Sequence, residues 1–257
     1  MKSIWTGTIG FGLVNIPIKM YSAVQSSELD LDMLDKKDLS NIHFKRVNAN
    51  TGKEVNWENI VRGYKLDERY IVLNDEDLEK AYPEKTKMIE IKEFIKEEEI
   101  NSIYYETPYY LEPERSGIKA YSLLRDALKK SGKAGLGSFV MRSKESLCLI
   151  KSMENVLMLN KIRFKQEIRD LIDLNIPTSA TSAEEIKMAT QLIDQLTGKF
   201  DISKYKDTYT DELMKLIKAK AKGKIVNPSQ LKVVHSNAKD LMSQLKASLE
   251  IKSSKAS

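Results

Sequence analysis

The chain contains very few of the residues from which catalytic and metal sites are usually built. Its 257 residues include one cysteine, Cys148, and two histidines, His43 and His235. A single cysteine excludes an intramolecular disulfide and indicates a reducing compartment. A zinc site with the usual number of Cys and His ligands cannot be assembled from these three side chains. Cys148 lies in the apolar run 147–150, which favours an inert buried thiol over a nucleophile.

Two further absences concern membranes and nucleotides. No apolar run approaches the ~18 residues that span a bilayer, and the N-terminus lacks the pattern of a signal peptide, so we expect a cytoplasmic, nucleoid-associated protein. The Gly132-Lys133 pair lacks the earlier glycine and the following Ser or Thr of a phosphate loop, because Ala127 and Ala134 stand there. We therefore expect no enzyme, no metal and no cofactor.

The first two-thirds of the chain is dominated by strand patterns. Residues 4–23 alternate apolar and small side chains with a period of two, as a strand with one buried face does. The turn-forming residues around Thr51-Gly52 separate two strand-like runs, which predicts a hairpin. Further strands are expected over residues 60–64, 69–73, 88–94, 103–105, 109–111, 139–141, 146–150 and 156–164.

Helices are expected mainly in the last third. One earlier helix is predicted over residues 118–130, with Gly132 as its stop, and Asn74 can cap a short acidic helix that ends near Lys80. Ser182 and Glu185 form a capping box before a second amphipathic helix that ends near Gly198. A third helix is expected over residues 211–222, and a lysine-rich amphipathic segment follows Asn237.

The net charge of +5 is distributed in blocks. Residues 36–65 hold seven Lys and Arg against three acids, whereas residues 66–114 hold six basic and fifteen acidic groups. Residues 119–151 and 215–257 are again basic, with eight against two and ten against two. Solvated surfaces can carry such runs, but basic blocks separated by an acidic one favour a polyanionic partner for particular faces.

A series of short motifs, in a fixed order, resembles one family. The series begins with residues 4–23 and continues through residues 52–55, 62–64, 70–73, 89–94, 109–113, 120–124, 157–164, 188–193 and 207–209. In this order and spacing the chain resembles bacterial Ku, the DNA-end-binding protein of non-homologous end joining, over about residues 1–223. Val47 departs from the pattern, because many relatives have a cysteine after the basic pair.

The resemblance implies a mixed β and α fold with three parts. A Ku-type β-barrel core over residues 1–175 would carry an inserted bridge (about 28–100) that encircles DNA. A helical arm (176–223) and a short lysine-rich tail (224–257) would follow. Two such chains would form a ring-shaped homodimer through which duplex DNA threads from a broken end, and the family further implies recruitment and stimulation of a multifunctional ATP-dependent DNA ligase.

Candidate DNA contacts follow from the basic blocks. Breaks have arbitrary sequence, so binding should use phosphate contacts and no base readout. We expect these contacts from Lys37, Lys45, Arg46, Lys53, Arg62 and Lys65 in the bridge and from Arg142 and Lys144 in the barrel. An apolar stripe at Leu241, Met242 and Leu245 in the tail is the candidate partner-binding surface. The alternative is a nucleic-acid-binding adaptor that forms no ring.

Overall fold

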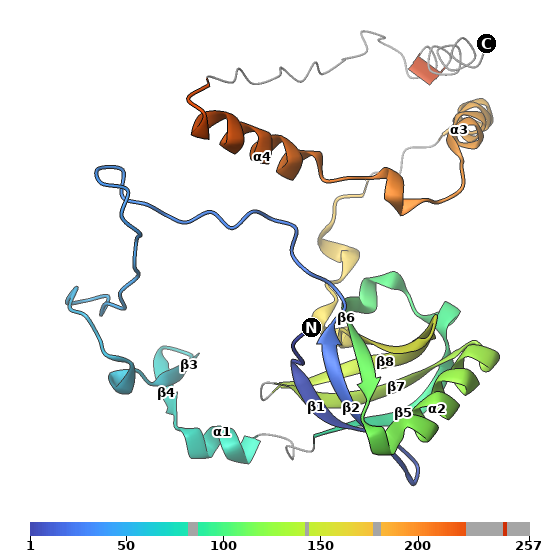
Figure 1. Cartoon of the computed structure of the whole chain (residues 1–257), viewed down its shortest axis with the longest axis horizontal. Helices are drawn as coiled ribbons and strands as arrows, with labels where there is room; N and C mark the ends of the chain where they lie inside the picture. Colours follow the sequence, from blue (N-terminus) through green and yellow to red (C-terminus); the bar gives the residue numbers. More distant parts are fainter. Residues whose placement is uncertain (82–86, 142–143, 177–180, 225–243, 246–257) are drawn as a thin grey trace. The chain divides into compact units, whose positions relative to one another are not determined.

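The computed structural model describes residues 1–81, 87–141, 144–176, 181–224 and 244–245. The chain divides into two compact units. The first unit contains residues 1–26 and 30–170, and the second contains residues 27–29 and 171–257. The first unit is rich in strands, and the described elements of the second are helical (Figure 1).

A closed barrel forms the centre of the first unit (Figure 1). Its seven described strands run in the order β1-β2-β6-β9-β8-β7-β5. They are β1 (Trp5–Phe11), β2 (Val14–Ser22), β5 (Met88–Lys96), β6 (Tyr105–Pro113), β7 (Lys133–Met141), β8 (Lys144–Met153) and β9 (Val156–Ile162). Neighbouring strands are antiparallel except β1 and β5, whose parallel pairing closes the barrel. The predicted mixed β and α class and the barrel are confirmed.

Alternating side chains fill the barrel. Ile16, Ile18 and Met20 of β2 are fully buried, whereas Pro17 between the first two is half-buried and Lys19 between the last two is exposed. This is the period of two expected for a strand with one face on a core. Helix α2 (Ile118–Ser131) adds Leu124 and Leu128 to the same core and packs against β2, β7 and β8. Gly132, in the left-handed region, ends this helix as the sequence predicted.

Tyr121 of α2 joins the helix to two strands of the barrel. Its hydroxyl donates to the Leu111 carbonyl at 2.6 Å and accepts from the Leu157 amide at 2.7 Å. Burial raises the pKa of Tyr121, so the phenol keeps the proton that it donates. The hydroxyl therefore satisfies two backbone groups of β6 and β9.

We expect the substitution Tyr121→Phe to destabilise the protein by about 2–4 kcal/mol, because both backbone groups lose their partner inside the barrel. Urea denaturation followed by circular dichroism measures the difference. Tyr70→Phe is the matched control, since Tyr70 is 70% exposed, and it should change the stability by less than about 0.5 kcal/mol. Equal stability of the two variants would show that the Tyr121 hydroxyl is dispensable.

Close packing explains an unusual glycine in β1. A Cβ atom at Gly7 would overlap the Trp5 indole and the carbonyl oxygen of Lys87, the residue just before β5. The Lys87 carbonyl accepts a 2.8 Å hydrogen bond from the Thr8 amide at this seam. Glycine therefore allows β1 to approach the chain at the start of β5.

Strand β6 corrects one sequence-based expectation. Two short strands were expected on either side of Pro108, but β6 runs through it as one strand. The register with β9 shifts between Tyr105 and Pro108, and Pro108 lies opposite Asn160. Such a shift disrupts the ladder locally, so a residue without an N–H group is tolerated inside the strand.

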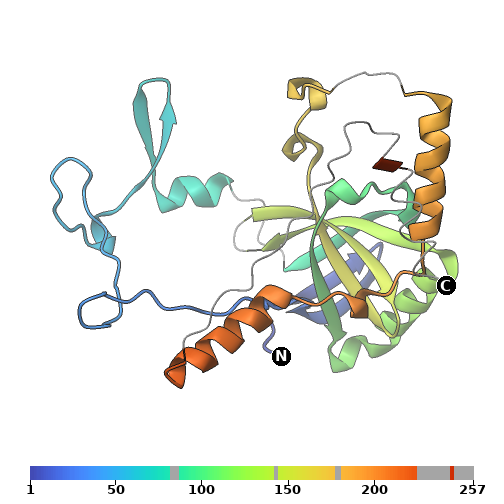
Figure 2. The same cartoon turned by 90° about the horizontal axis from the view of Figure 1, so that it is seen from above.

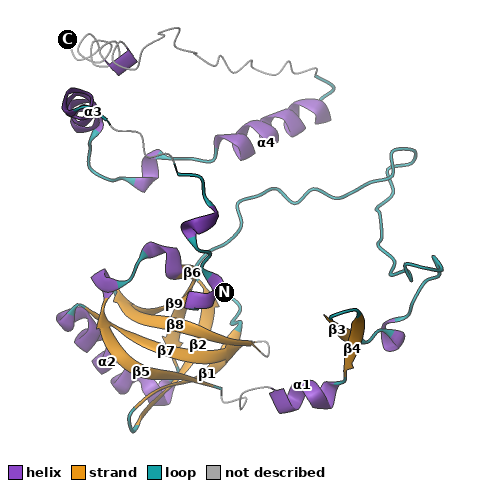
Figure 3. Ribbon diagram, turned by 180° about the vertical axis from the view of Figure 1, so that it is seen from behind, coloured by secondary structure: helices purple, strands orange, loops and turns teal. Residues whose placement is uncertain are grey.

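Between β2 and β5 the chain forms the inserted segment, residues 23–87 (Figure 3). It contains the hairpin of β3 (Arg62–Leu66) and β4 (Arg69–Leu73) and the helix α1 (Asp75–Ala81). Asn74 caps α1 as predicted, accepting from the Asp77 amide at 2.7 Å. The expected bridge range of 28–100 extends too far, because β5 within it is a barrel strand whose Ile89 and Ile91 are buried.

The second unit contains the helices α3 (Ala183–Leu196) and α4 (Thr208–Ala221) (Figure 2). The capping box of Ser182 and Glu185 is present and begins α3 as predicted. Helix α4 begins three residues earlier than expected, because the Asp207 side chain accepts from the Thr210 amide and caps it there. Leu241 and Met242 of the candidate partner surface lie outside the described residues, whereas Leu245 is described and half-buried.

Candidate nucleic-acid interface

A tight turn brings Lys45 and Arg46, two of the expected DNA-binding residues, near the residues that follow the turn. The Asn48 side chain accepts hydrogen bonds from the amides of Asn50 and Thr51, each at 3.0 Å, and Gly52 has a φ of +67°. An isolated antiparallel bridge joins Val47 to Glu54. The hairpin that the sequence predicted around Thr51-Gly52 is therefore present as a short turn with a single bridge, not as two long strands.

The adjacent cations Lys45 and Arg46 have different partners. The Lys45 ammonium pairs with the Glu54 carboxylate at 2.7 Å. The Arg46 guanidinium carbon lies 4.8 Å from the centroid of the Trp57 ring. Both residues are exposed, so neither interaction removes its side chain from solvent. One cation is neutralised by a carboxylate, and the other keeps its net charge beside an aromatic ring.

The other expected cations of the inserted segment are also exposed. Lys37 and Lys53 lie in loops, and Arg62 and Lys65 lie in β3 opposite Leu73 and Tyr70. Within the part of the chain that the structure describes, none of these four side chains forms an ion pair. Because their charges are not compensated locally, they add to a positive potential along the segment.

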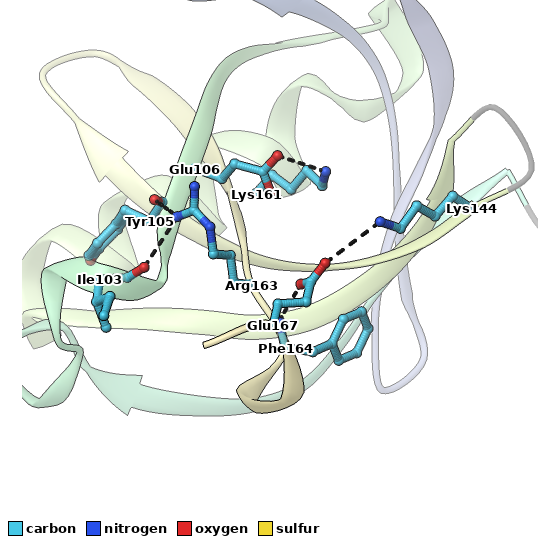
Figure 4. Close-up of polar contacts among 8 residues, drawn as sticks. All are labelled: Ile103, Tyr105, Glu106, Lys144, Lys161, Arg163, Phe164 and Glu167. Carbon is cyan, nitrogen blue, oxygen red and sulfur yellow. Dashed lines mark hydrogen bonds and ion pairs between the residues drawn. The ribbon is translucent and has the colours of Figure 1, made fainter. Parts of the chain in front are cut away.

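Figure 4 shows that the basic residues at the start of β8 and the end of β9 already have partners within the protein. Lys144 lies 3.7 Å from Glu167, and Lys161 lies 3.1 Å from Glu106. Arg163 donates to the backbone carbonyls of Ile103 at 3.2 Å and Tyr105 at 2.6 Å. The second barrel candidate, Arg142, lies outside the described residues.

Glu167 explains why this side of the barrel is a weaker candidate for phosphate binding. Its carboxylate accepts from the Phe164 amide at 2.8 Å, and this hydrogen bond, with Lys144 and Lys161 nearby, lowers its pKa. Glu167 therefore stays ionised and competes with a phosphate for Lys144. Of the two groups of expected contacts, the inserted segment is the more available one.

Exposed apolar side chains are abundant outside the barrel. In the inserted segment, Phe44 is 80% and Tyr70 is 70% exposed, and in the second unit Ile172 is 89% and Phe200 is 80% exposed. Where such side chains form a contiguous patch, they mark interaction sites in soluble proteins. The charge pattern alone did not predict this surface, although aromatic residues within a polar segment were a visible signal.

A hollow of about 760 Å³ on the barrel lies among β2, β6 and α2 and is lined by none of the expected DNA-binding residues. Its polar groups bind one another: Tyr21 donates to Glu112 at 2.5 Å, and Arg125 donates to the Asn155 carbonyl at 3.2 Å. Cys148 is fully buried in the core, as expected, and burial raises the pKa of its thiol to about 12. Such a thiol stays protonated and is a poor nucleophile.

In the described part of the chain, no helix combines the length and the apolar character needed to cross a bilayer. The barrel, its basic inserted segment and the helical second unit define the class of protein: a β-barrel scaffold that presents charged and apolar surfaces for binding.

Residues 10–188 match the family described as the Ku70/Ku80 beta-barrel domain. A "Non-homologous end joining protein Ku" of Pseudomonas aeruginosa is 38% identical over 86% of this chain and 77% of its own length. Proteins of the same name from Coxiella burnetii and Bacillus subtilis are 35% and 36% identical. These matches cover 98% and 97% of this chain and 95% and 82% of the relatives. The chain belongs to the Ku family.

Proposed function

We propose that two copies of this chain form a ring that binds the ends of double-stranded DNA without sequence preference, and that the complex acts in non-homologous end joining. The relatives named for this pathway support the role. The observation that carries the DNA-binding part is the inserted segment, whose exposed cations Lys37, Lys53, Arg62 and Lys65 have no acidic partner among the described residues.

Phosphate contacts suit this task. Lys and Arg side chains release condensed counterions from the duplex, which supplies affinity without information about the bases. Selectivity for ends would come from topology, because a closed ring loads only where the duplex stops. The protein would bind and hold ends and leave the covalent chemistry to other proteins, in line with its buried, protonated thiol.

The exposed apolar residues support the homodimer. Side chains such as Phe44 and Phe200 are left in solvent by a single copy, and an obligate homodimer covers a large apolar area. One bridge is half of a ring, so a two-fold symmetric pair is the smallest closed assembly. Solution mass by light scattering tests this directly: a dimer is expected, and a monomer that still binds ends would support the non-ring adaptor instead.

The region after Gly223 is proposed to recruit the ATP-dependent ligase of the pathway through Leu241, Met242 and Leu245. We expect truncation after Gly223 to abolish ligase stimulation and to leave end binding within about twofold, because the barrel and inserted segment are intact. Ligation assays with the pathway's ligase, together with DNA-binding titrations, measure both effects. Weakened DNA binding with unchanged stimulation would show that the six lysines after Gly223 bind DNA instead.

A further inference from the structure

Trp57, the tryptophan of the inserted segment, stands out in that segment because a guanidinium lies against its ring. Its side chain is 67% exposed, and the Arg46 guanidinium carbon lies 4.8 Å from the ring centroid. The Val55 amide donates to the Arg46 carbonyl at 2.9 Å, which holds the two arms of the turn in register. The pairing of Arg46 with Trp57 is thus built on an ordered local turn.

The turn gives Arg46 and its neighbour Lys45 different partners. Consecutive side chains of an extended segment point to opposite faces, and here Lys45 meets Glu54 at 2.7 Å while Arg46 meets Trp57. Bringing Lys45 to a phosphate would require breaking its ion pair or bringing the Glu54 carboxylate near the DNA. Arg46 carries no such cost, because no carboxylate pairs with it among the described residues.

A contact with an aromatic ring leaves the guanidinium free to bind an anion. The ring is no hydrogen-bond acceptor of ordinary strength, so the N–H groups of Arg46 remain available for a bidentate contact with phosphate oxygens. The ring also restricts a long side chain that otherwise samples many rotamers, and this restriction lowers the entropic cost of ordering it on binding. The attraction between cation and ring grows as the pair loses water.

We infer that Trp57 is a positioning residue that holds Arg46 for contact with the phosphodiester backbone of DNA, whereas Lys45 is committed to its ion pair with Glu54. This inference rests on the proposed DNA binding. It assigns phosphate binding to Arg46 and the ion pair with Glu54 to Lys45. It also gives the exposed Trp57 of the inserted segment a role in DNA binding through Arg46.

The test uses the full-length protein and a fluorescently labelled blunt duplex, titrated at several salt concentrations. Arg46→Gln should weaken binding and reduce the slope of log K against log salt by about 1 per protomer. Trp57→Leu should weaken binding about three- to tenfold with the slope nearly unchanged, because the charge of Arg46 remains. Trp57→Phe should restore most of the loss. The double variant Arg46→Gln/Trp57→Leu should bind no worse than Arg46→Gln alone.

The matched control is Lys45→Gln/Glu54→Gln, which removes the ion pair without changing the net charge and should leave affinity within about twofold. If this control variant reduces the slope of log K against log salt as much as Arg46→Gln does, the assignment of Lys45 to the ion pair instead of to phosphate is overturned. Additive losses for Arg46 and Trp57, or a Trp57→Leu variant that binds normally, would overturn the positioning role. So would a Trp57→Leu protein that becomes monomeric, since Trp57 would then serve contact between copies. Wild-type protein that fails to bind duplex DNA would instead contradict the proposed function itself.

Discussion

Replacement of both Lys45 and Arg46 by glutamate is expected to weaken binding to all duplex sequences alike, by a hundredfold or more (an order-of-magnitude expectation from the loss of charge-assisted contacts in two protomers). The substitution would remove the proposed phosphate contact of Arg46 and would place acidic groups beside Glu54, which the native protein pairs with Lys45 at 2.7 Å. Like charges then repel both the DNA and one another.

Salt dependence identifies the cause of this loss. Each phosphate contact contributes about 0.9 to the slope of log K against log salt, so the slope should decrease by about 2 for a dimer. Lys129→Glu/Lys130→Glu is the control, because these exposed residues end α2 on the barrel and the change in net charge is the same. An unchanged slope in the Lys45→Glu/Arg46→Glu variant, or an equal loss in the control, would show that Arg46 does not contact phosphate.

The second large effect concerns the fold. Gly7→Ala is expected to destabilise the protein by about 3 kcal/mol or more, because the added methyl group overlaps the Lys87 carbonyl and the Trp5 indole. The overlap forces apart the seam of β1 and β5 that closes the barrel. Urea denaturation monitored by circular dichroism measures the loss.

Gly198→Ala is the matched control, since no atom lies within 4 Å of a Cβ at that position, and its stability should change by less than about 1 kcal/mol. A Gly7→Ala protein that is as stable as the wild type would contradict the packing role. Normal stability with lost DNA binding would instead indicate that Gly7 lies at the DNA contact.

Where a single local signal dominated, the sequence predicted the structure well. The Asn74 cap, the capping box of Ser182 and the Gly132 stop each depend on neighbouring residues alone, and all three are present. Strand β7 begins at Lys133, although only residues 139–141 were expected. Gly135 and Gly137 lie in this strand against Ile91 and the Glu90 carbonyl, so their small size serves a neighbour that is distant in sequence.

The candidate site was predicted less completely. Charge blocks located the basic inserted segment, but they could not show that Lys45 has an acidic partner and Arg46 an aromatic one, because Glu54 and Trp57 reach them only through the turn at Asn48 and Gly52. The pairing of Lys144 with Glu167 could not be predicted either, because it depends on β8 lying beside β9 in the barrel. A count of charges cannot distinguish a paired cation from a free one.

The central claim is that a ring of two copies encircles DNA, and topology tests it most directly. The protein is loaded on a linear duplex, the duplex is ligated into a covalent circle, and release is followed in high salt; a preformed covalent circle of the same sequence is the control. The proposed ring predicts binding to the linear duplex, little binding to the preformed circle, and retention after circularisation. Equal binding to both DNAs, with release from the ligated circle at the same rate as from the linear form, would contradict it.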